Sequence, residues 1–383
     1  MLERRMQEEL HLLDELTAAR DFGAVLKLGA PLLMKPWSAA ELALVRFYLG
    51  QAHCRLVEPR EALVYLPAAR EQFELQKAER LAVEALDWEA SAWGLLDDPR
   101  ASPMEDEALE RCRKLAPRQR QLEARILGHL ANMFVVTRQW DLAISYYEAA
   151  VAAASAVKDL LQLAKMHHGL GIAYQRSQDP ACARAHLDKA LALYSIESDS
   201  SALYRVENDL GSLLLREGRL DAAEQHLLKA LFGAEELHLN RRGRGYVLVN
   251  LGEVCLRTGR PEESRRYLEA ARDVGDAIGE RIVLADAAIL LGRLEESLGN
   301  ARLADAHFRS AIRALEEVQM PVRLRDCHVE FAQVLEARGD MGAAYRQLQL
   351  AVAAERATAA ETADRQSDQP QPQRSPTRLH GAF

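Results

Sequence analysis

An apolar residue followed by a small residue recurs along the chain at intervals of 40 or 41 residues. The small members of these pairs are Gly50, Ser91, Ala131, Gly171, Gly211, Gly252, Gly292 and Ala332. After most of them a second series follows, small, large and small, as in Ala183, Leu187 and Ala190. Steps of four and three residues share one face of a helix. The pattern predicts helices that approach closely at small residues, with the large residue filling the space between units.

Each unit is predicted to be a helix, a glycine turn and a second helix. Gly218, Gly259, Gly299 and Gly339 stand seven residues after the small residue of their units, where a left-handed turn would end the first helix. The period predicts helices of about 16 residues, or ~24 Å. The second unit is out of register, and its segment DDPRASPMED predicts a turn about five residues longer than the others. After that turn, Ala108, Cys112 and Leu115 resume the spacing of the second helix.

The repeats divide the chain into three predicted parts. Residues 1–37 form a divergent helix pair that caps the N-terminal end, and residues 38–357 hold eight repeats. Residues 358–383 are polar, contain three prolines and have almost nothing to bury, so this tail is predicted to be disordered.

The repeat resembles the tetratricopeptide repeat (TPR), with its small residue in the first helix, its Ala, aromatic or Leu, Ala series in the second and its glycine turn. The resemblance covers about residues 38–356 and implies an all-α, right-handed superhelix of about nine helix pairs. The period departs from the usual 34 residues. Long TPR helices are similar to those of kinesin light chains, of the sensory regions of bacterial helix-turn-helix regulators and of peptide-pheromone receptors.

The resemblance also implies a binding site, because ligands of TPR proteins usually lie against the inner wall formed by the first helices. Amide side chains can pair with both groups of a peptide backbone, and arginine can grip carboxylates. The residues that the resemblance places on this wall are Arg125, Asn132, Lys165, His168, Gln175, Arg205, Asn208, Ser212, Arg216, Tyr246, Asn250, Arg257 and Arg293. The first two units offer Phe47, Trp88 and Leu95 instead, as an apolar groove end or as internal packing. The alternative is that the polar residues are ordinary solvated helix faces.

Composition and charge narrow the function further. The 383 residues carry a net charge of −8, with a pI near 5.8, which argues against direct nucleic-acid contact. The chain starts with charged residues and has no apolar run of about 20 residues, so we expect a cytoplasmic protein without a membrane segment. Its five cysteines are far apart, which predicts reduced, mostly buried thiols without disulfides or a zinc site.

Candidate chemistry is sparse. The chain has no Gly-rich phosphate loop, HExxH, GxSxG or EF-hand loop, so we expect no catalytic residues, metal or cofactor. His167 and His168 are adjacent and should point in different directions on a helix. His186, His226 and His307 share one position in three second helices, which is typical of rings beside a core face, with pH sensing or metal binding as the alternative.

The sequence therefore predicts a non-catalytic module that binds a peptide or protein segment in its concave groove. The leading hypothesis is a bacterial regulatory sensor or adaptor linked to transcription. The first 40 residues are too short and too acidic for a helix-turn-helix domain, so we expect any DNA-binding part to be absent or in a partner. The alternative is a structural scaffold without ligand sensing, an enzyme is the third interpretation, and a homodimer is left open.

Overall fold

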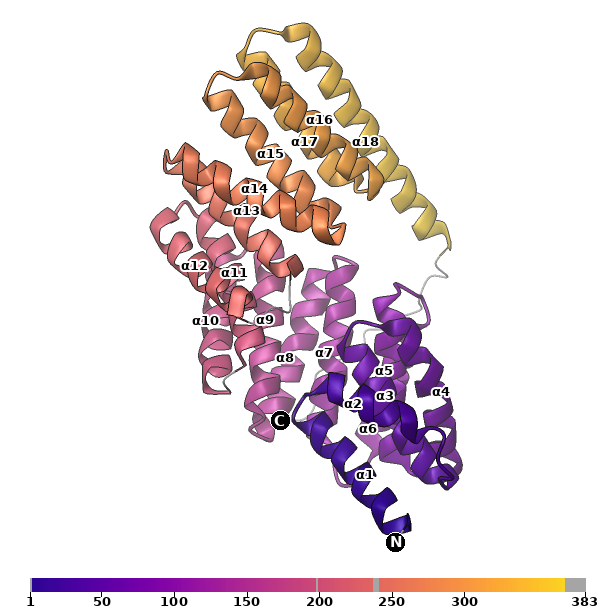
Figure 1. The fold of residues 1–383 in the computed structure, drawn as a ribbon. Coiled ribbons are helices and arrows are strands. Elements are labelled where there is room, and N and C mark those ends of the chain that lie inside the picture. The colour runs from indigo at the N-terminus through magenta and orange to yellow at the C-terminus, as the bar shows by residue number, and fades with distance from the viewer. Residues whose placement is uncertain (1, 198, 237–240, 369–383) are drawn as a thin grey trace. The chain divides into compact units, whose positions relative to one another are not determined.

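The computed structural model describes residues 2–197, 199–236 and 241–368, and all of its regular elements there are α-helices (Figure 1). The chain forms two compact units, unit 1 (Met1–Asp199) and unit 2 (Ser200–Phe383). Unit 1 contains α1 (Leu2–Ala18), α2 (Phe22–Leu32), α3 (Ala39–Arg55), α4 (Pro59–Leu75), α5 (Glu79–Leu95), α6 (Ala101–Lys114), α7 (Arg120–Val136), α8 (Trp140–Ala156), α9 (Leu160–Arg176) and α10 (Pro180–Ile196). Unit 2 contains α11 (Ser200–Arg216), α12 (Leu220–Glu236), α13 (Arg241–Arg257), α14 (Pro261–Ile278), α15 (Arg281–Ser297), α16 (Ala301–Glu317), α17 (Pro321–Ala337) and α18 (Met341–Asp368). The nine helix pairs of these described residues confirm the predicted all-α fold of about nine helix pairs.

Within each unit the odd-numbered helices, here called A helices, alternate with the even-numbered B helices. Consecutive helices pack against each other, and A helices of successive pairs also meet, as α3 with α5, α7 with α9 and α11 with α13. The A helices are therefore closer together than the B helices and form the inner side of each unit. None of the helices described is both long enough and apolar enough to cross a membrane.

The first helix pair packs on the repeats, and the last helix extends beyond its predicted boundary. At the N-terminal end, Leu13 and Val25 are fully buried in a cluster with Leu49 of α3, so the first helix pair covers the start of the repeats. At the other end, α18 continues to Asp368, beyond the boundary at residue 357, because Ala, Glu, Arg and Gln there favour helix. The rest of the predicted tail, residues 369–383, lies outside the described residues.

The left-handed turns between the helices of a pair occur where the sequence pattern predicts them. Gly218, Gly259, Gly299 and Gly339 have φ between 71° and 83°. In unit 1 the equivalent residues are Val57, Asp97, Arg138 and Gln178, whose φ lies between 55° and 67° although none is a glycine. The turn closes by hydrogen bonds such as that from the Glu58 backbone N–H to the carbonyl oxygen of His53, 2.9 Å long. The repeat geometry thus imposes the same turn on both units.

The small residue of each A helix packs against the large residue of its B helix. A Cβ atom on Gly171 would lie 2.6 Å from Cγ of Leu187, and one on Gly211 would lie 2.6 Å from Cγ of Leu227. Such distances are too short for a real carbon contact, so glycine is what lets the two helices approach.

The Gly171→Ala variant is expected to be less stable than the wild type by about 1–2 kcal/mol. Overpacking against Leu187 costs about 1–3 kcal/mol, and alanine regains up to about 1 kcal/mol through its higher helix propensity. Urea unfolding followed by tryptophan fluorescence measures the difference, because Trp37, Trp88, Trp93 and Trp140 all belong to unit 1. The control is Gly94→Ala, where the nearest atom lies 3.8 Å from the new Cβ and no loss is expected. A Gly171→Ala variant as stable as Gly94→Ala would contradict this packing.

Two predictions for the second repeat, its small residue and the length of its turn, are wrong. Its small residue is the fully buried Ala90 rather than the half-buried Ser91, since Asp97 follows Ala90 by the usual seven residues and has the left-handed φ. The loop to α6 covers residues 96–100, two more than residues 56–58 between α3 and α4, and not about five more. Most of the predicted long turn is helical, because ASPMED begins α6.

The predicted register of helix α6, with Ala108, Cys112 and Leu115 at the positions of its small, large and small residues, is also wrong. The buried positions Ala62, Leu66, Ala69 and Phe73 of α4 are spaced by four, three and four residues. The same spacing in α6 falls on Ala101, Glu105, Ala108 and Cys112. An acidic residue therefore stands where α4 has a core leucine.

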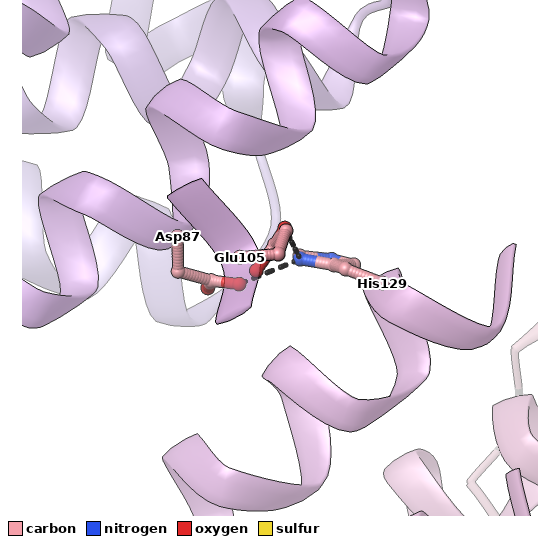
Figure 2. Close-up of side chains that lie close together, drawn as sticks. All are labelled: Asp87, Glu105 and His129. Carbon is pink, nitrogen blue, oxygen red and sulfur yellow. Dashed lines mark hydrogen bonds and ion pairs between the residues drawn. The ribbon is translucent and has the colours of Figure 1, made fainter. Parts of the chain in front are cut away.

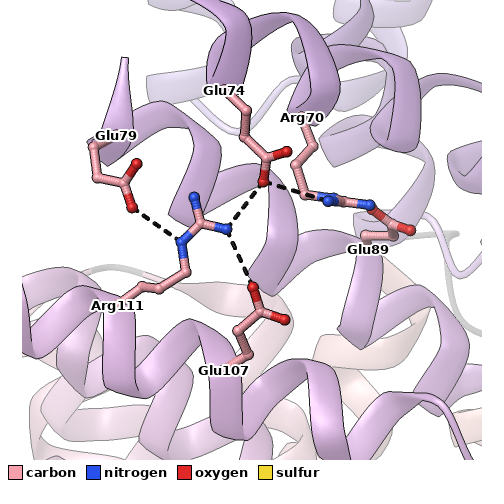
Figure 3. Close-up of polar contacts among 6 residues, drawn as sticks. All are labelled: Arg70, Glu74, Glu79, Glu89, Glu107 and Arg111. Atoms are coloured by element: carbon pink, nitrogen blue, oxygen red, sulfur yellow. Dashed lines mark hydrogen bonds and ion pairs between the residues drawn. The ribbon is translucent and has the colours of Figure 1, made fainter. Parts of the chain in front are cut away.

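Ion pairs hold the short helix α6 against its neighbours (Figure 3). Arg111 of α6 places Nη1 3.0 Å from Glu74 of α4 and Nε 3.0 Å from Glu79 at the start of α5. Arg70 of α4 continues the network through a 2.8 Å contact to Glu89 of α5. A network of charges shared by three helices stabilises the fold more than isolated surface ion pairs do.

Candidate functional site

The residues predicted for the groove are divided between the two units. Unit 1 holds Arg125, Asn132, Lys165, His168 and Gln175, and unit 2 holds Arg205, Asn208, Ser212, Arg216, Tyr246, Asn250, Arg257 and Arg293. All of them lie on A helices, which form the inner side of their unit. The two sets are therefore two separate candidate surfaces.

The most unusual site in unit 1 is a cluster of charged residues from three helices (Figure 2). Asp87 of α5 is completely buried, and its Oδ2 accepts a 2.6 Å hydrogen bond from Nε of Arg125. Its other oxygen, Oδ1, lies 2.7 Å from Nδ1 of His129, which like Arg125 belongs to α7. Asp87 thus joins two cationic side chains one turn apart on the next A helix.

Glu105 completes this cluster from α6. Its side chain is fully buried, and neither carboxylate oxygen has a hydrogen-bond partner among the described residues. Oε1 lies 3.5 Å from Nδ1 of His129, so the two acids face the same imidazole (Figure 2). A buried carboxyl group without hydrogen bonds is costly when ionised.

The environment changes the protonation of all three groups. Burial, followed by the charge of Asp87, raises the pKa of Glu105 to about 8. Burial acts to raise the pKa of Asp87 too, but the nearby charges of His129 and Arg125 outweigh it and hold this pKa well below its usual value. Burial would lower the pKa of His129, but Asp87 raises it to about 9. At neutral pH the cluster therefore holds an ionised Asp87, a protonated His129 and a neutral Glu105.

Asp87, Glu105 and His129 are also residue types that bind metal ions, and their ligand atoms lie within 4.8 Å of one another. A metal ion would have to replace the protons on His129 and Glu105 beside the positive charge of Arg125. The charge of Asp87 is already balanced by its two basic partners, so the arrangement favours an internal ion-pair cluster.

The other predicted residues of unit 1 have varied surroundings. Asn132 is exposed and accepts a hydrogen bond from the Tyr147 hydroxyl group. His168 is largely buried, with its ring edge-on to Tyr194. Gln175 is half-buried, and so is Lys165, which has no hydrogen bond or ion pair in the described part of the chain. Burial, followed by the charges of Arg55 and Arg20, lowers the pKa of Lys165 to about 7.

In unit 2 two predicted amides lie side by side. Nδ2 of Asn250 on α13 donates a 3.1 Å hydrogen bond to Oδ1 of Asn208 on α11. Arg257, also on α13, donates a 2.8 Å hydrogen bond from Nη1 to the carbonyl oxygen of Leu215. Adjacent A helices thus place amide groups one repeat apart on the same surface.

The other predicted residues of unit 2 lie on the two helices of the amide pair or further along the unit. Arg205 and Arg216 are exposed on α11, and Ser212 and Tyr246 are half-buried. Arg293 lies further along unit 2, where it pairs with Glu330 at 3.4 Å and lines a pocket of about 590 Å³ together with Glu296 and Asp326. Arg293 is thus surrounded by acidic side chains, and we do not count it among the polar residues around Asn208.

The histidines behave as side chains beside the core. His167 and His168 point to different neighbours, since Nδ1 of His167 lies 3.0 Å from Nδ1 of His186 and His168 faces Tyr194. Burial lowers the pKa of both His167 and His186. His226 pairs with Glu207 at 2.5 Å. Among the described residues, two groups of three side chains could hold a metal ion, Asp87 with Glu105 and His129, and Glu224 with Cys255 and Glu263. Neither group includes His167, His168, His186 or His226.

Sequence reasoning missed Asp87 and Glu105. Glu105 could have been found from its spacing to Ala101 and Ala108, which repeats the small, large, small pattern with an acid in the large position. The shift in register of the second repeat concealed this signal. Asp87 carries no comparable signal, because its partners lie about 40 residues away along the chain.

Comparisons with known proteins agree with the repeat pattern. The model of the tetratricopeptide repeat family matches residues 122–196, 162–236, 199–274 and 243–317, which together cover more than half of the chain. No curated protein sequence matches the chain. The identification of the family therefore rests on the match to the repeat model.

Three solved structures resemble the chain over most of its length. Aspartyl phosphate phosphatase F from Bacillus subtilis has 13% sequence identity and a TM-score of 0.61, covering 91% of this chain and 94% of that one. The apo form of the quorum sensor NprR from B. thuringiensis has 14% identity and a TM-score of 0.60, covering 93% and 100%. A Rap protein complexed with competence and sporulation factor has 15% identity and a TM-score of 0.57, covering 84% and 99%. At these identities the likeness is one of fold. With its eight helix pairs of 40-residue period, its left-handed turns and the match to the repeat model, the chain belongs to the tetratricopeptide repeat family.

Proposed function

We propose that the protein is a regulatory module that binds an extended peptide or a protein segment on the inner, A-helix surface of unit 2. The observation that carries this proposal is the contact between Asn208 and Asn250 on successive A helices. Each amide has one acceptor oxygen and two N–H donors, so the pair retains groups that can bind a peptide backbone. Arg205 and Ser212 on the same helix as Asn208 add exposed or half-buried polar groups.

The similarity of the fold to two solved structures also supports the proposal of peptide binding. One similar structure is of a quorum sensor, and another is of a Rap protein complexed with competence and sporulation factor. Control of transcription through such binding is part of our proposal. The module is proposed to be non-catalytic, and the phosphatase name of one neighbour describes that protein, with which this chain shares only the fold.

Native mass spectrometry with a synthetic library of random hexapeptides tests the proposal. The wild-type chain is expected to retain peptides, and the Asn208→Ala/Asn250→Ala variant should bind them about 5- to 150-fold more weakly, because the loss of one hydrogen bond at each amide costs about 1–3 kcal/mol in total. The matched control is Gln225→Ala, which removes an exposed amide from the B helix α12.

Two results would oppose the proposal. Equal peptide binding by the wild type and the double variant would place the site away from the amide pair. A wild-type chain that retains no peptide but binds a large protein, equally in both variants, would favour the structural scaffold.

A further inference from the structure

Repeats of the described chain place a polar side chain of the A helix against one of the B helix, 19 residues further along the sequence. Between α11 and α12, Nδ1 of His226 lies 2.5 Å from a carboxylate oxygen of Glu207. Between α17 and α18, Nδ1 of His328 lies 2.8 Å from Oε1 of Gln347. In both pairs the imidazole can donate its Nδ1 proton to an oxygen atom, so each pair is explained as a hydrogen bond between the two helices.

The same two positions hold two histidines in α9 and α10. Nδ1 of His167 lies 3.0 Å from Nδ1 of His186, with the ring centres 5.1 Å apart and the ring planes inclined by 39°. At this distance the two nitrogen atoms can share only one proton, because one ring must donate it and the other must accept it through a lone pair. Unlike the Glu207 and Gln347 pairs, this pair therefore directs two nitrogen ligand atoms at the same place.

The surroundings hold this pair of nitrogen atoms in position and leave it open to solvent. The ring of Tyr174 stacks on that of His186, with the centres 5.4 Å apart and the planes inclined by 18°. The Tyr174 hydroxyl group in turn donates a 3.4 Å hydrogen bond to Glu148 of α8. His167 and His186 are both half-buried, so an ion from solution can reach their edge of unit 1.

Both rings are neutral at neutral pH, the form in which imidazole binds metal ions. Burial, followed by the charge of His186, lowers the pKa of His167 to about 4. Burial also lowers the pKa of His186, helped by Lys189 and opposed by Glu148. Lys189 acts against any cation here, but its side chain is exposed and can turn away into solvent.

We propose that Nδ1 of His167 and Nδ1 of His186 together bind a divalent transition-metal ion, with water molecules as its other ligands. Bonds from such an ion to imidazole are about 2.0–2.1 Å long, so nitrogen atoms 3.0 Å apart enclose an angle of about 90–100° at the metal. This angle suits the square-planar or tetragonal geometry of Cu²⁺ and Ni²⁺ better than the tetrahedral geometry of Zn²⁺. Cu²⁺ is the stronger binder of these ions.

The step conserves the proton that the two rings share. When the metal takes the lone pairs of both Nδ1 atoms, the proton moves to Nε2 of the ring that carried it, and none is released. The bound ion joins α9 to α10 inside one repeat of unit 1. The site lies apart from the amide pair of unit 2, and it does not depend on the proposed peptide binding.

Electron paramagnetic resonance of the full chain with one equivalent of copper(II) sulfate, in a buffer without coordinating groups, tests the site. We expect a tetragonal Cu²⁺ spectrum with hyperfine coupling to two imidazole nitrogen atoms. In the His167→Gln variant one of these couplings should be lost. This variant gives His186 the amide partner that Gln347 gives to His328, so we expect it to fold.

Isothermal titration calorimetry with the same salt measures the affinity. The His167→Gln variant should bind Cu²⁺ at least ~10-fold more weakly than the wild type, because one of two protein ligands is lost. The matched control is His307→Gln, which removes a half-buried histidine at the position equivalent to His186, opposite Ala288 in its A helix. It should bind Cu²⁺ as the wild type does. His186→Gln serves as a second variant, should His167→Gln fail to fold.

Two outcomes would overturn the proposal. One is a wild-type chain that binds Cu²⁺ no more tightly than the folded His167→Gln or His186→Gln variant. The other is a Cu²⁺ spectrum whose nitrogen couplings are the same in the wild type and in either of these variants, since the ion would then be bound elsewhere.

Discussion

The Asp87→Asn variant is expected to lose about 3–5 kcal/mol of unfolding free energy at pH 7. The substitution keeps the size of the side chain and removes the only negative charge that Arg125 and a protonated His129 share at hydrogen-bond distance. Removing one partner of a buried ion pair leaves the other charges uncompensated, which costs more than the pair itself contributes. The pKa of His129 should also fall, because Asp87 is what raises it.

Urea unfolding monitored by tryptophan fluorescence reports this loss for unit 1, which contains all four tryptophans. The matched control is Glu110→Gln, which neutralises an acid of an exposed ion pair with Lys114 and should change the stability little. An Asp87→Asn variant that resembled this control would show that the buried cluster does not depend on the charge of Asp87.

The Glu105→Gln variant is expected to become more stable relative to the wild type as the pH rises from about 4.5 to about 8. Glu105 keeps its proton up to a pKa of about 8 in the folded chain, whereas in the unfolded chain it releases the proton near its usual pKa of 4.5. The folded state therefore binds more protons in this range, and its stability falls with rising pH by about 1.4 kcal/mol per pH unit. Glutamine mimics the protonated acid, so the variant avoids this loss.

Urea unfolding of both proteins at pH 5, 6, 7 and 8 measures the difference between their free energies of unfolding. The contribution of His129 falls as well, between its unfolded pKa of 6.5 and its folded pKa of about 9, but it is present in both proteins. Glu110→Gln again serves as the control, with a difference from the wild type that stays nearly constant over this range. Parallel curves for the wild type and Glu105→Gln would mean that Glu105 is ionised in the folded chain.

The repeat architecture could be predicted from the spacing of small and large residues. Packing between the helices of one repeat joins residues at a fixed separation, as Gly171 and Leu187 or Gly211 and Leu227 do. Because such contacts recur in most repeats, the periodic placement of small and large residues is enough to predict the helix pairs and their turns. The left-handed turns at Val57 and Arg138 follow the same positions without a glycine, so register decides them more than residue type.

Which polar residues contact one another could not be predicted from the repeat pattern. The register of α6 placed Glu105 at a core position, and this depended on a loop of different length and on a helix that begins late. Asp87 of α5 contacts Arg125 and His129 of α7, the next A helix. Trp88 of α5 carries Arg125 of α7 and Arg55 of α3 over its ring. These contacts join different repeats through long, flexible side chains, whose direction depends on how closely successive A helices approach. A repeat pattern specifies the helix pairs, but the distances between repeats decide which polar side chains form an ion pair and which stay unpaired.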